Sequence, residues 1–133
     1  MNAEQLTVKS SARTEMVDIT RLVAAVVNKS GVAGGTCHVF VPHTTAGVTI
    51  NENADPAVQQ DLGRALEKLV PWDAGYAHAE GNSAAHLKAS LMGFTATIPV
   101  ERGQMLLGTW QGIYFCEFDG PRTRKVIVKV TAG

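Results

Sequence analysis

The sequence lacks the features that mark disulfide-rich, membrane-spanning or secreted proteins. It contains only two cysteines, Cys37 and Cys116. Each lies in an apolar run, which favours two small buried side chains in a reducing compartment over a disulfide. No apolar run approaches the roughly 18 residues of a membrane span, and the N-terminus lacks the basic start and apolar stretch of a signal peptide. We therefore expect a cytoplasmic protein without a membrane partner.

Net charge is also absent, because 12 Lys and Arg residues offset 12 Asp and Glu residues. No overall field would attract nucleic acid, so a nucleic-acid partner is not expected. Apolar residues make up 45% of the chain and charged residues 18%, which is typical of a globular protein and argues against disorder. A chain of 133 residues can bury a core of its own, so we expect a single domain over residues 1–133.

Hydrophobic periodicity predicts helices placed irregularly between strands. Asp55 followed by Pro56 is a typical helix start, and the apolar stripe of this longest helix, from Val58 to Leu69, is expected to face the core. Strands at 36–41 and 46–50 are close enough in sequence to pair as a hairpin. Further strands are expected at 6–9, 94–100, 105–118 and 125–130, and further helices at about 20–30 and 83–91. This order predicts a compact α+β domain with mainly antiparallel β-sheets packed with two or three helices.

What the sequence does contain is a group of histidines in polar surroundings. His43, His78 and His86 lie among hydroxyls, amides and carboxylates, whereas His38 alternates within an apolar strand and is expected to be structural. Imidazole titrates near neutral pH and binds first-row metals, so the three histidines indicate either acid–base chemistry or a metal site. No Walker loop, dinucleotide glycine motif, G-x-S-x-G or H-E-x-x-H is present.

The predicted helix at 83–91 offers a second indication. Asn82 and His86 are four residues apart and would share one face, and His78 lies just upstream. The free N–H groups at a helix N-terminus favour phosphate or carboxylate, to which Lys88 could add charge. An ordinary capped helix with solvent-facing histidines explains the same spacing, and the residues alone do not decide between the two.

Other polar segments allow both structural and functional interpretations. Asp55 is explained as a helix cap, whereas no cap explains Glu52, which favours a functional role for that carboxylate. Trp110, between two glycines, could stack on a flat ring with Gln111 hydrogen-bonding beside it, although a core or interface tryptophan is commoner. Arg122, after a turn, is suited to binding an anion. Three further cations are expected to be solvated charges: Arg102, Arg124 and Lys125.

Six segments that contain most of these polar residues follow one another along the chain: His43-Thr44-Thr45-Ala46, Ile50-Asn51-Glu52-Asn53, Gly81-Asn82, Ala85-His86-Leu87-Lys88, Gly108-Thr109-Trp110-Gln111 and Asp119-Gly120-Pro121-Arg122. Together they resemble the YjbQ family, also called secondary thiamine-phosphate synthase enzymes. The resemblance implies an α+β fold, a homotrimer with sites near subunit boundaries, and a weak thiamine-phosphate synthase activity. That reaction joins hydroxymethylpyrimidine diphosphate to a thiazole phosphate and releases pyrophosphate. The resemblance also implies a divalent metal at His43, His78 and His86, with zinc expected and magnesium as the alternative for a diphosphate substrate.

The resulting hypothesis is a small transferase that acts on a phosphorylated small molecule. The residues expected to be catalytic are Glu52, His86 and Lys88. The residues expected to bind substrate are Thr44, Thr45, Asn51, Asn82, Trp110, Gln111 and Arg122. Three alternatives stay open: a metal-dependent hydrolase, a trimer that binds a phosphometabolite without turning it over, and a structural trimer whose histidines coordinate only adventitious metal.

Overall fold

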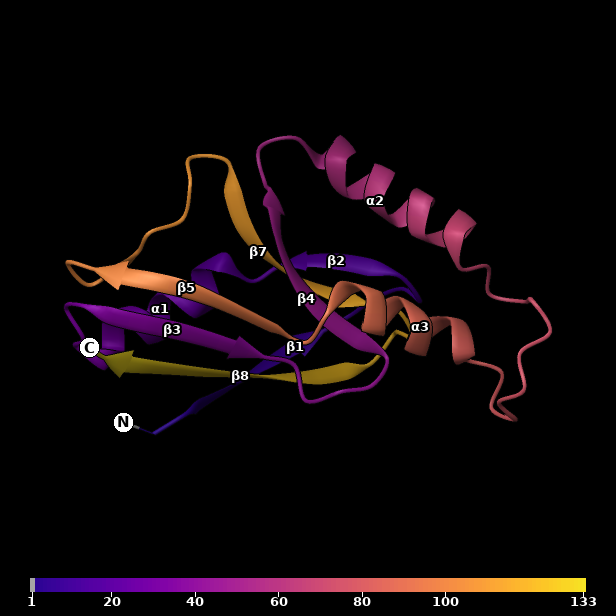
Figure 1. Cartoon of the computed structure of the whole chain (residues 1–133), viewed down its shortest axis with the longest axis horizontal. Helices are drawn as coiled ribbons and strands as arrows, with labels where there is room; N and C mark the ends of the chain where they lie inside the picture. The colour runs from indigo at the N-terminus through magenta and orange to yellow at the C-terminus, as the bar shows by residue number, and fades with distance from the viewer. Residues whose placement is uncertain (1) are drawn as a thin grey trace.

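The computed structural model describes residues 2–133, which form two antiparallel sheets and three helices (Figure 1). The predicted α+β class is therefore confirmed. The strands are β1 (Glu4–Lys9), β2 (Glu15–Asp18), β3 (Gly35–Phe40), β4 (Ala46–Glu52), β5 (Thr95–Glu101), β6 (Gln104–Met105), β7 (Gln111–Glu117) and β8 (Thr123–Ala132). The helices are α1 (Thr20–Ser30), α2 (Pro56–Leu69) and α3 (Ser83–Met92). Within residues 2–133, no helix has both the length and the hydropathy needed to cross a membrane.

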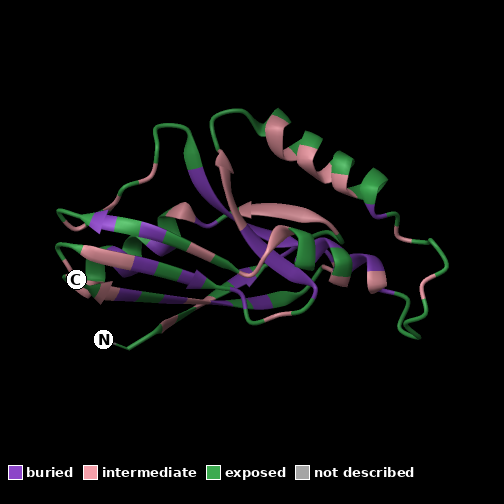
Figure 2. Cartoon of the chain, viewed as in Figure 1, coloured by how far each residue is buried: buried purple, intermediate pink, exposed green. Residues whose placement is uncertain are grey.

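The larger sheet has the strand order β1-β8-β3-β5-β6 and the smaller sheet the order β2-β7-β4. The main hydrophobic core joins buried side chains of both sheets to α1, as the buried segments in Figure 2 show. Strand β8 alternates regularly, with Val126, Val128 and Val130 buried and the positions between them more exposed. This alternation arises because successive side chains of a strand point to opposite faces.

Two expectations about the strands are wrong. Strand β3 does not pair with β4 as a hairpin, because β3 pairs with β5 and β8 whereas β4 pairs with β7. Residues 42–45 instead carry the chain from the larger sheet to the smaller one. The run 105–118 is not one strand, since Gln111 Oε1 accepts a hydrogen bond from the Gly108 N–H (2.8 Å) in a turn that separates β6 from β7.

Helix α2 begins as predicted but packs differently. Asp55 caps it by accepting a hydrogen bond from the Ala57 N–H (2.9 Å), with Pro56 at the first helical position. The stripe from Val58 to Leu69 was expected to face the core, yet no residue of α2 is buried and Leu69 is 70% exposed. The expectation is confirmed only in part: Val58, Leu62 and Leu66 are half-buried, and Leu66 packs against the hydrophobic cluster formed mainly by α3 and β7. Leu69 remains exposed because α2 lies to one side of the sheets (Figure 1).

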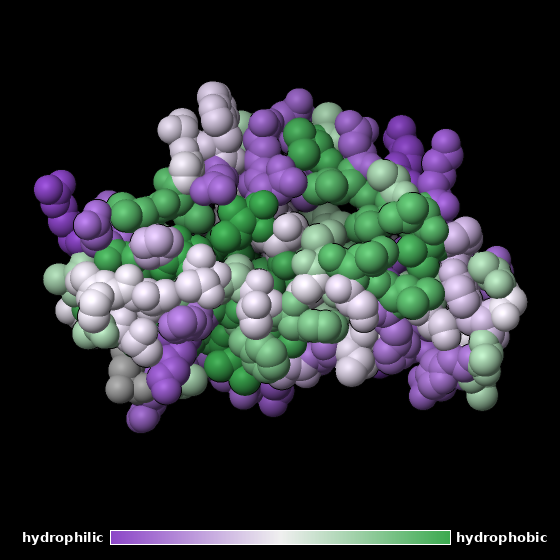
Figure 3. All heavy atoms as spheres, viewed as in Figure 1, coloured by the Kyte–Doolittle hydropathy of each residue, from purple (hydrophilic) through white to green (hydrophobic). Residues whose placement is uncertain are grey.

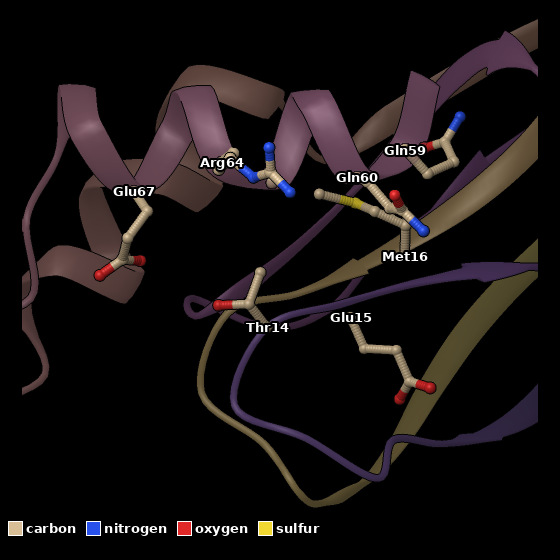
Figure 4. A pocket seen from close by; sticks show the side chains of 8 residues that line it. Thr14, Glu15, Met16, Gln59, Gln60, Arg64 and Glu67 are labelled. Atoms are coloured by element: carbon tan, nitrogen blue, oxygen red, sulfur yellow. The ribbon is translucent and has the colours of Figure 1, made fainter. Parts of the chain in front are cut away.

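A groove of about 450 Å³ separates α2 from β2. In Figure 4 the side chains of Arg64 and Gln60 on α2 lie opposite Thr14 and Met16. On the face seen in Figure 3, hydrophobic side chains gather over α3 and beside α2. Part of the apolar surface of the two helices is therefore left uncovered, including Leu87 and Leu91 on α3.

Candidate functional site

One pocket, of about 500 Å³, lies where three chain segments meet. The first is the connection from β3 to β4, the second is the entry and first turn of α3, and the third runs from the end of β7 into β8. We call it the histidine pocket, and its lining residues are Pro42, His43, Thr44, Thr45, His78, Glu80, Asn82, His86, Asp119, Arg122 and Arg124. The three histidines that the sequence placed in separate segments are thus brought together.

His78 and His86 lie side by side in this pocket. Their ring centroids are 5.4 Å apart and their planes are nearly perpendicular, at 89°. His86 belongs to the first turn of α3, whereas His78 lies in the preceding loop, where its carbonyl accepts a hydrogen bond from the Gly81 N–H (3.1 Å). The two imidazoles can offer hydrogen bonds to the same ligand, or pass a proton to it, since both belong to one cavity.

His43 is held by the backbone of the larger sheet. Its Nε2 accepts a hydrogen bond from the Lys125 N–H (2.9 Å), which places the proton of the neutral ring on Nδ1. Burial lowers the pKa of His43 below its ordinary value of 6.5, and the positive charge of Arg124 lowers it further. His43 is therefore a neutral ring at pH 7 that presents an N–H donor.

The three histidines do not form a three-ligand metal site as they are arranged. A metal would need a free lone pair on each ring, but the Nε2 lone pair of His43 already accepts the Lys125 N–H and its Nδ1 carries the proton. Over residues 2–133, no group of three or more His, Cys, Asp or Glu side chains is placed to hold an ion. The expected zinc site stays a prediction.

Asn82 is the most distinctive polar residue of the pocket. It is only 8% exposed, and its Nδ2 donates a hydrogen bond to Asp119 Oδ2 (2.9 Å). This bond fixes the amide orientation, because the flipped amide would set two oxygens against each other. Asn82 Oδ1 is then buried without a partner. A buried acceptor without a partner is costly, so a ligand with an N–H or O–H group could satisfy it.

Arg122 reaches the pocket from its rim. Its Nη2 donates to Asp119 Oδ2 (3.0 Å) and its Nε donates to the Asp119 carbonyl (2.8 Å). The side chain is 53% exposed, so the ion pair is weak and the guanidinium keeps free donors. This position fits the predicted role of Arg122 in binding an anion, while Asp119 orients both Arg122 and Asn82.

Arg124 was expected to be a solvated charge, and this is wrong. It is 5% exposed and forms a buried ion pair with Glu117, in which Nε donates to Oε1 (2.9 Å) and Nη2 to Oε2. Arg124 Nη2 also donates to Thr45 Oγ1 (2.8 Å), which positions the loop that carries His43. A signal was present, because Arg124 falls two residues before Val126 on the inward face of the alternating strand β8.

Several residues expected at the site lie elsewhere. Lys88 is 1% exposed and donates a hydrogen bond to Glu67 Oε2 on α2 (2.6 Å), so it does not line the histidine pocket. Four others gather around the far end of β4 and the start of β7: Asn51, Glu52, Trp110 and Gln111. Strand β4 rises about 3.3 Å per residue and thus separates this group from Thr45 by about 20 Å.

The two cysteines take no part in the pocket. Both are buried and free, as expected from their apolar runs. Burial raises the pKa of Cys37 to about 11 and that of Cys116 to about 12. Both are therefore thiols at neutral pH and poor nucleophiles.

Comparison with known proteins places the chain in a family. A family model described as UPF0047 protein YjbQ-like matches residues 4–133. UPF0047 protein YugU of Bacillus subtilis is 51% identical over 126 residues, covering 94% of this chain and 96% of that protein. UPF0047 protein MJ1081 of Methanocaldococcus jannaschii is 50% identical, covering 92% of this chain and 89% of that protein.

Solved structures agree with this result. The crystal structure of an uncharacterised conserved protein of the YjbQ/UPF0047 family from Clostridium acetobutylicum has a TM-score of 0.95 at 55% identity, covering 96% of this chain and 99% of that chain. The hypothetical protein APE1520 from Aeropyrum pernix has a TM-score of 0.95 at 36% identity, with full coverage of both chains. The chain therefore belongs to the YjbQ-like UPF0047 family.

Proposed function

We propose that this protein is an enzyme that acts on a phosphorylated small molecule bound in the histidine pocket. The observation that carries the proposal is the convergence of His43, His78 and His86 on one cavity with Asn82 and Arg122. Convergent polar groups in a concave site are the usual mark of a small-molecule site. An inert capped helix, the structural interpretation of the sequence, would not require these separate segments to meet.

The chemistry of the lining favours a phosphate or diphosphate ester. The imidazole N–H groups, the free donors of Arg122 and the N-terminus of α3 supply hydrogen bonds to anionic oxygens. The side chain of Asn82, at the N-cap position, makes no capping hydrogen bond to α3. Its Oδ1 is buried without a hydrogen-bond partner, so a ligand that donates an N–H or O–H group would satisfy it. A phosphorylated molecule that also carries an N–H or O–H group meets both demands.

The reaction that we propose is the transfer implied by the family resemblance, with thiamine-phosphate synthase activity as a secondary function. The thiazole nitrogen forms a bond to the methylene carbon of the pyrimidine while the bond from that carbon to the diphosphate oxygen breaks. Diphosphate leaves with the bonding electrons, so negative charge grows on its oxygens. Donors already in place, such as His86 and Arg122, stabilise that charge without rearranging.

Binding of inorganic pyrophosphate, measured by calorimetry, tests the site first. We expect the wild-type protein and His38→Ala to bind it equally, because His38 lies on the exposed side of β3 and does not line the pocket. His86→Ala should weaken binding at least about tenfold, the loss of one good hydrogen bond to a charged group. Equal affinity of the two variants would refute the assignment of the pocket.

Incubation with both thiamine precursors tests the reaction. If His38→Ala forms the condensation product and His86→Ala does not, the result supports the transferase. Release of phosphate without the second substrate would favour a hydrolase, since water would then be the acceptor. Ligand-induced thermal stabilisation without product would favour the phosphometabolite-binding alternative.

The zinc expectation is tested on the same variants. Elemental analysis of the purified wild-type protein would have to find about one zinc per chain for a three-histidine site. Loss of that metal in His86→Ala but not in His38→Ala would support the predicted ligands. Binding would then require the hydrogen bond between His43 and Lys125 to break.

A further inference from the structure

A second hollow adjoins the histidine pocket. It has a volume of about 300 Å³, and its lining residues are Phe40, Val41, Pro42, His43, Thr44 and Phe94. Three residues line both cavities: Pro42, His43 and Thr44. A ligand can therefore occupy the two hollows at once by passing over these residues. We call the second hollow the aromatic groove.

Two phenylalanines supply the aromatic lining of the groove. Phe40 ends β3 on the outward face of the strand, and 44% of its surface is exposed. Phe94 is half-buried just after α3 and packs against a second, smaller hydrophobic cluster, whose buried members are Ala85, Ala89, Tyr114, Cys116 and Phe118. The two segments are tied together, because the Val41 N–H donates to the Phe94 carbonyl (2.8 Å). The backbone segments that carry the two rings are thus held next to each other.

The groove and the histidine pocket differ in polarity. The pocket is lined by imidazole, amide, guanidinium and carboxylate groups, whereas the groove offers polar side chains only from His43 and Thr44. His43 stands at the boundary, where its hydrogen bond to the Lys125 backbone holds the ring in place. Small-molecule sites commonly combine such an apolar wall with a few polar groups that set orientation.

We propose that Phe40 and Phe94 form a ring-binding subsite, and that the ligand is a phosphate ester whose planar ring lies in the aromatic groove while its phosphate lies in the histidine pocket. This inference rests on the proposed function of that pocket. It replaces Trp110, the residue expected from the sequence to stack on a ring, because Trp110 lies beyond the far end of β4. Aromatic side chains favour a flat partner through offset or edge contacts.

Two probes with the same headgroup test the subsite by calorimetry: methyl phosphate and benzyl phosphate, which adds one phenyl ring. We expect benzyl phosphate to bind the wild-type protein about tenfold more tightly, the usual size of a well-placed ring contact. Phe40→Ala and Phe94→Leu should each remove most of this preference and leave the affinity for methyl phosphate within about twofold. Phe94→Leu keeps apolar volume in the cluster, and Phe40 is exposed, so both variants are expected to fold.

Leu22→Ala is the matched control, because Leu22 is 45% exposed on α1 and lines neither cavity. The inference alone is overturned if methyl phosphate binds but benzyl phosphate binds no better. It is also overturned if Trp110→Ala removes the preference while Phe40→Ala does not, or if Phe40→Ala changes the molecular mass in solution, since Phe40 would then be covered by a second copy. If neither probe binds, the proposed function fails as well.

Discussion

Glu117 is a carboxylate with no exposed surface, directly behind the histidine pocket. Arg124 donates to both of its oxygens, the Ser10 hydroxyl donates to Oε1 (2.7 Å) and the Asp119 N–H donates to Oε2 (3.0 Å). Burial alone would raise the pKa of Glu117, but these hydrogen bonds outweigh it and hold the pKa below its ordinary value of 4.5. The ion pair joins β7 to β8 and, through Arg124, orients the loop that carries His43.

Replacing Glu117 by Gln should destabilise the protein by about 3 kcal/mol at pH 7, because Arg124 is left buried without its counter-ion. The pH dependence has a definite sign. Below about pH 4.5 the unfolded chain takes up a proton at Glu117 before the folded chain does, so the free energy of unfolding falls until the pH passes the lowered pKa.

Urea unfolding at pH 7 and pH 4 checks this expectation. Glu117→Gln should lose less stability on acidification than the wild-type protein does. Glu101→Gln, at an exposed position of β5, is the control that should match the wild type. A Glu117→Gln protein with wild-type acid sensitivity would contradict the assignment.

Helix α2 is attached to the rest of the molecule by few contacts, and one of them is an ion pair. Lys88 on α3 is 1% exposed, yet its ammonium donates to the Glu67 carboxylate on α2, whose side chain is 51% exposed. No residue of α2 is buried. Together with the half-buried Leu66, the pair holds α2 beside the helix that carries His86.

Glu67→Gln should destabilise the protein by about 1–3 kcal/mol, since the buried Lys88 ammonium loses its charged partner. Lys88→Met should cost less, because it removes the buried charge together with the need for a partner. The double variant should be no less stable than Lys88→Met. Denaturant unfolding of the three variants measures these differences, and additive losses would argue that the two side chains do not interact.

Two glycines provide a matched test of how the elements pack. At Gly63, inside α2, an added Cβ meets no atom within 4 Å, so Gly63→Ala should stabilise the protein by about 0.5–1 kcal/mol. At Gly47, in β4, the same Cβ would lie 2.5 Å from the Gly93 carbonyl oxygen at the end of α3. Gly47→Ala should therefore lower the thermal midpoint while Gly63→Ala raises it. Shifts of the same sign would contradict the close approach of α3 to β4.

Over the whole molecule, the residues expected at the site form two groups. His43, His78 and His86 meet at one end of β4, whereas Glu52 and Trp110 lie near the other end. Within one chain the second group cannot reach the histidine pocket across the length of β4. An assembly in which sites lie near subunit boundaries, as the family resemblance implies, would allow residues of two copies to share a site.

We predict a homotrimer, with a mass of about 42 kDa by light scattering, which is three times the chain mass of 14.1 kDa. Coexpression tests the shared site directly. If each site takes residues from two copies, mixed assemblies of Glu52→Gln and His86→Ala chains should contain some sites with neither substitution, and activity should partly return. A mass near that of one chain, or no recovery in mixed assemblies, would contradict the prediction.

Much of the local structure could be inferred from the order of residues. The cap at Asp55, the limits of α3 between Asn82 and Gly93, and the burial of both thiols all follow from chain neighbours and short periodicities. The α+β class follows from the order of the elements. The histidines could be singled out because imidazole titrates near neutral pH and binds metals, so that several of them among polar residues indicate a site.

Contacts between distant segments decided the rest. The pairing of β3, the hydrogen bond from Arg124 to Thr45 and the ion pair of Lys88 with Glu67 each depend on residues far away in the chain. No local pattern encodes such partners, because a side chain's surroundings in a sheet are set by the neighbouring strands and not by its own. The folded chain alone brought three imidazoles into one cavity and kept Glu52 out of it, since the direction of β4 separates them.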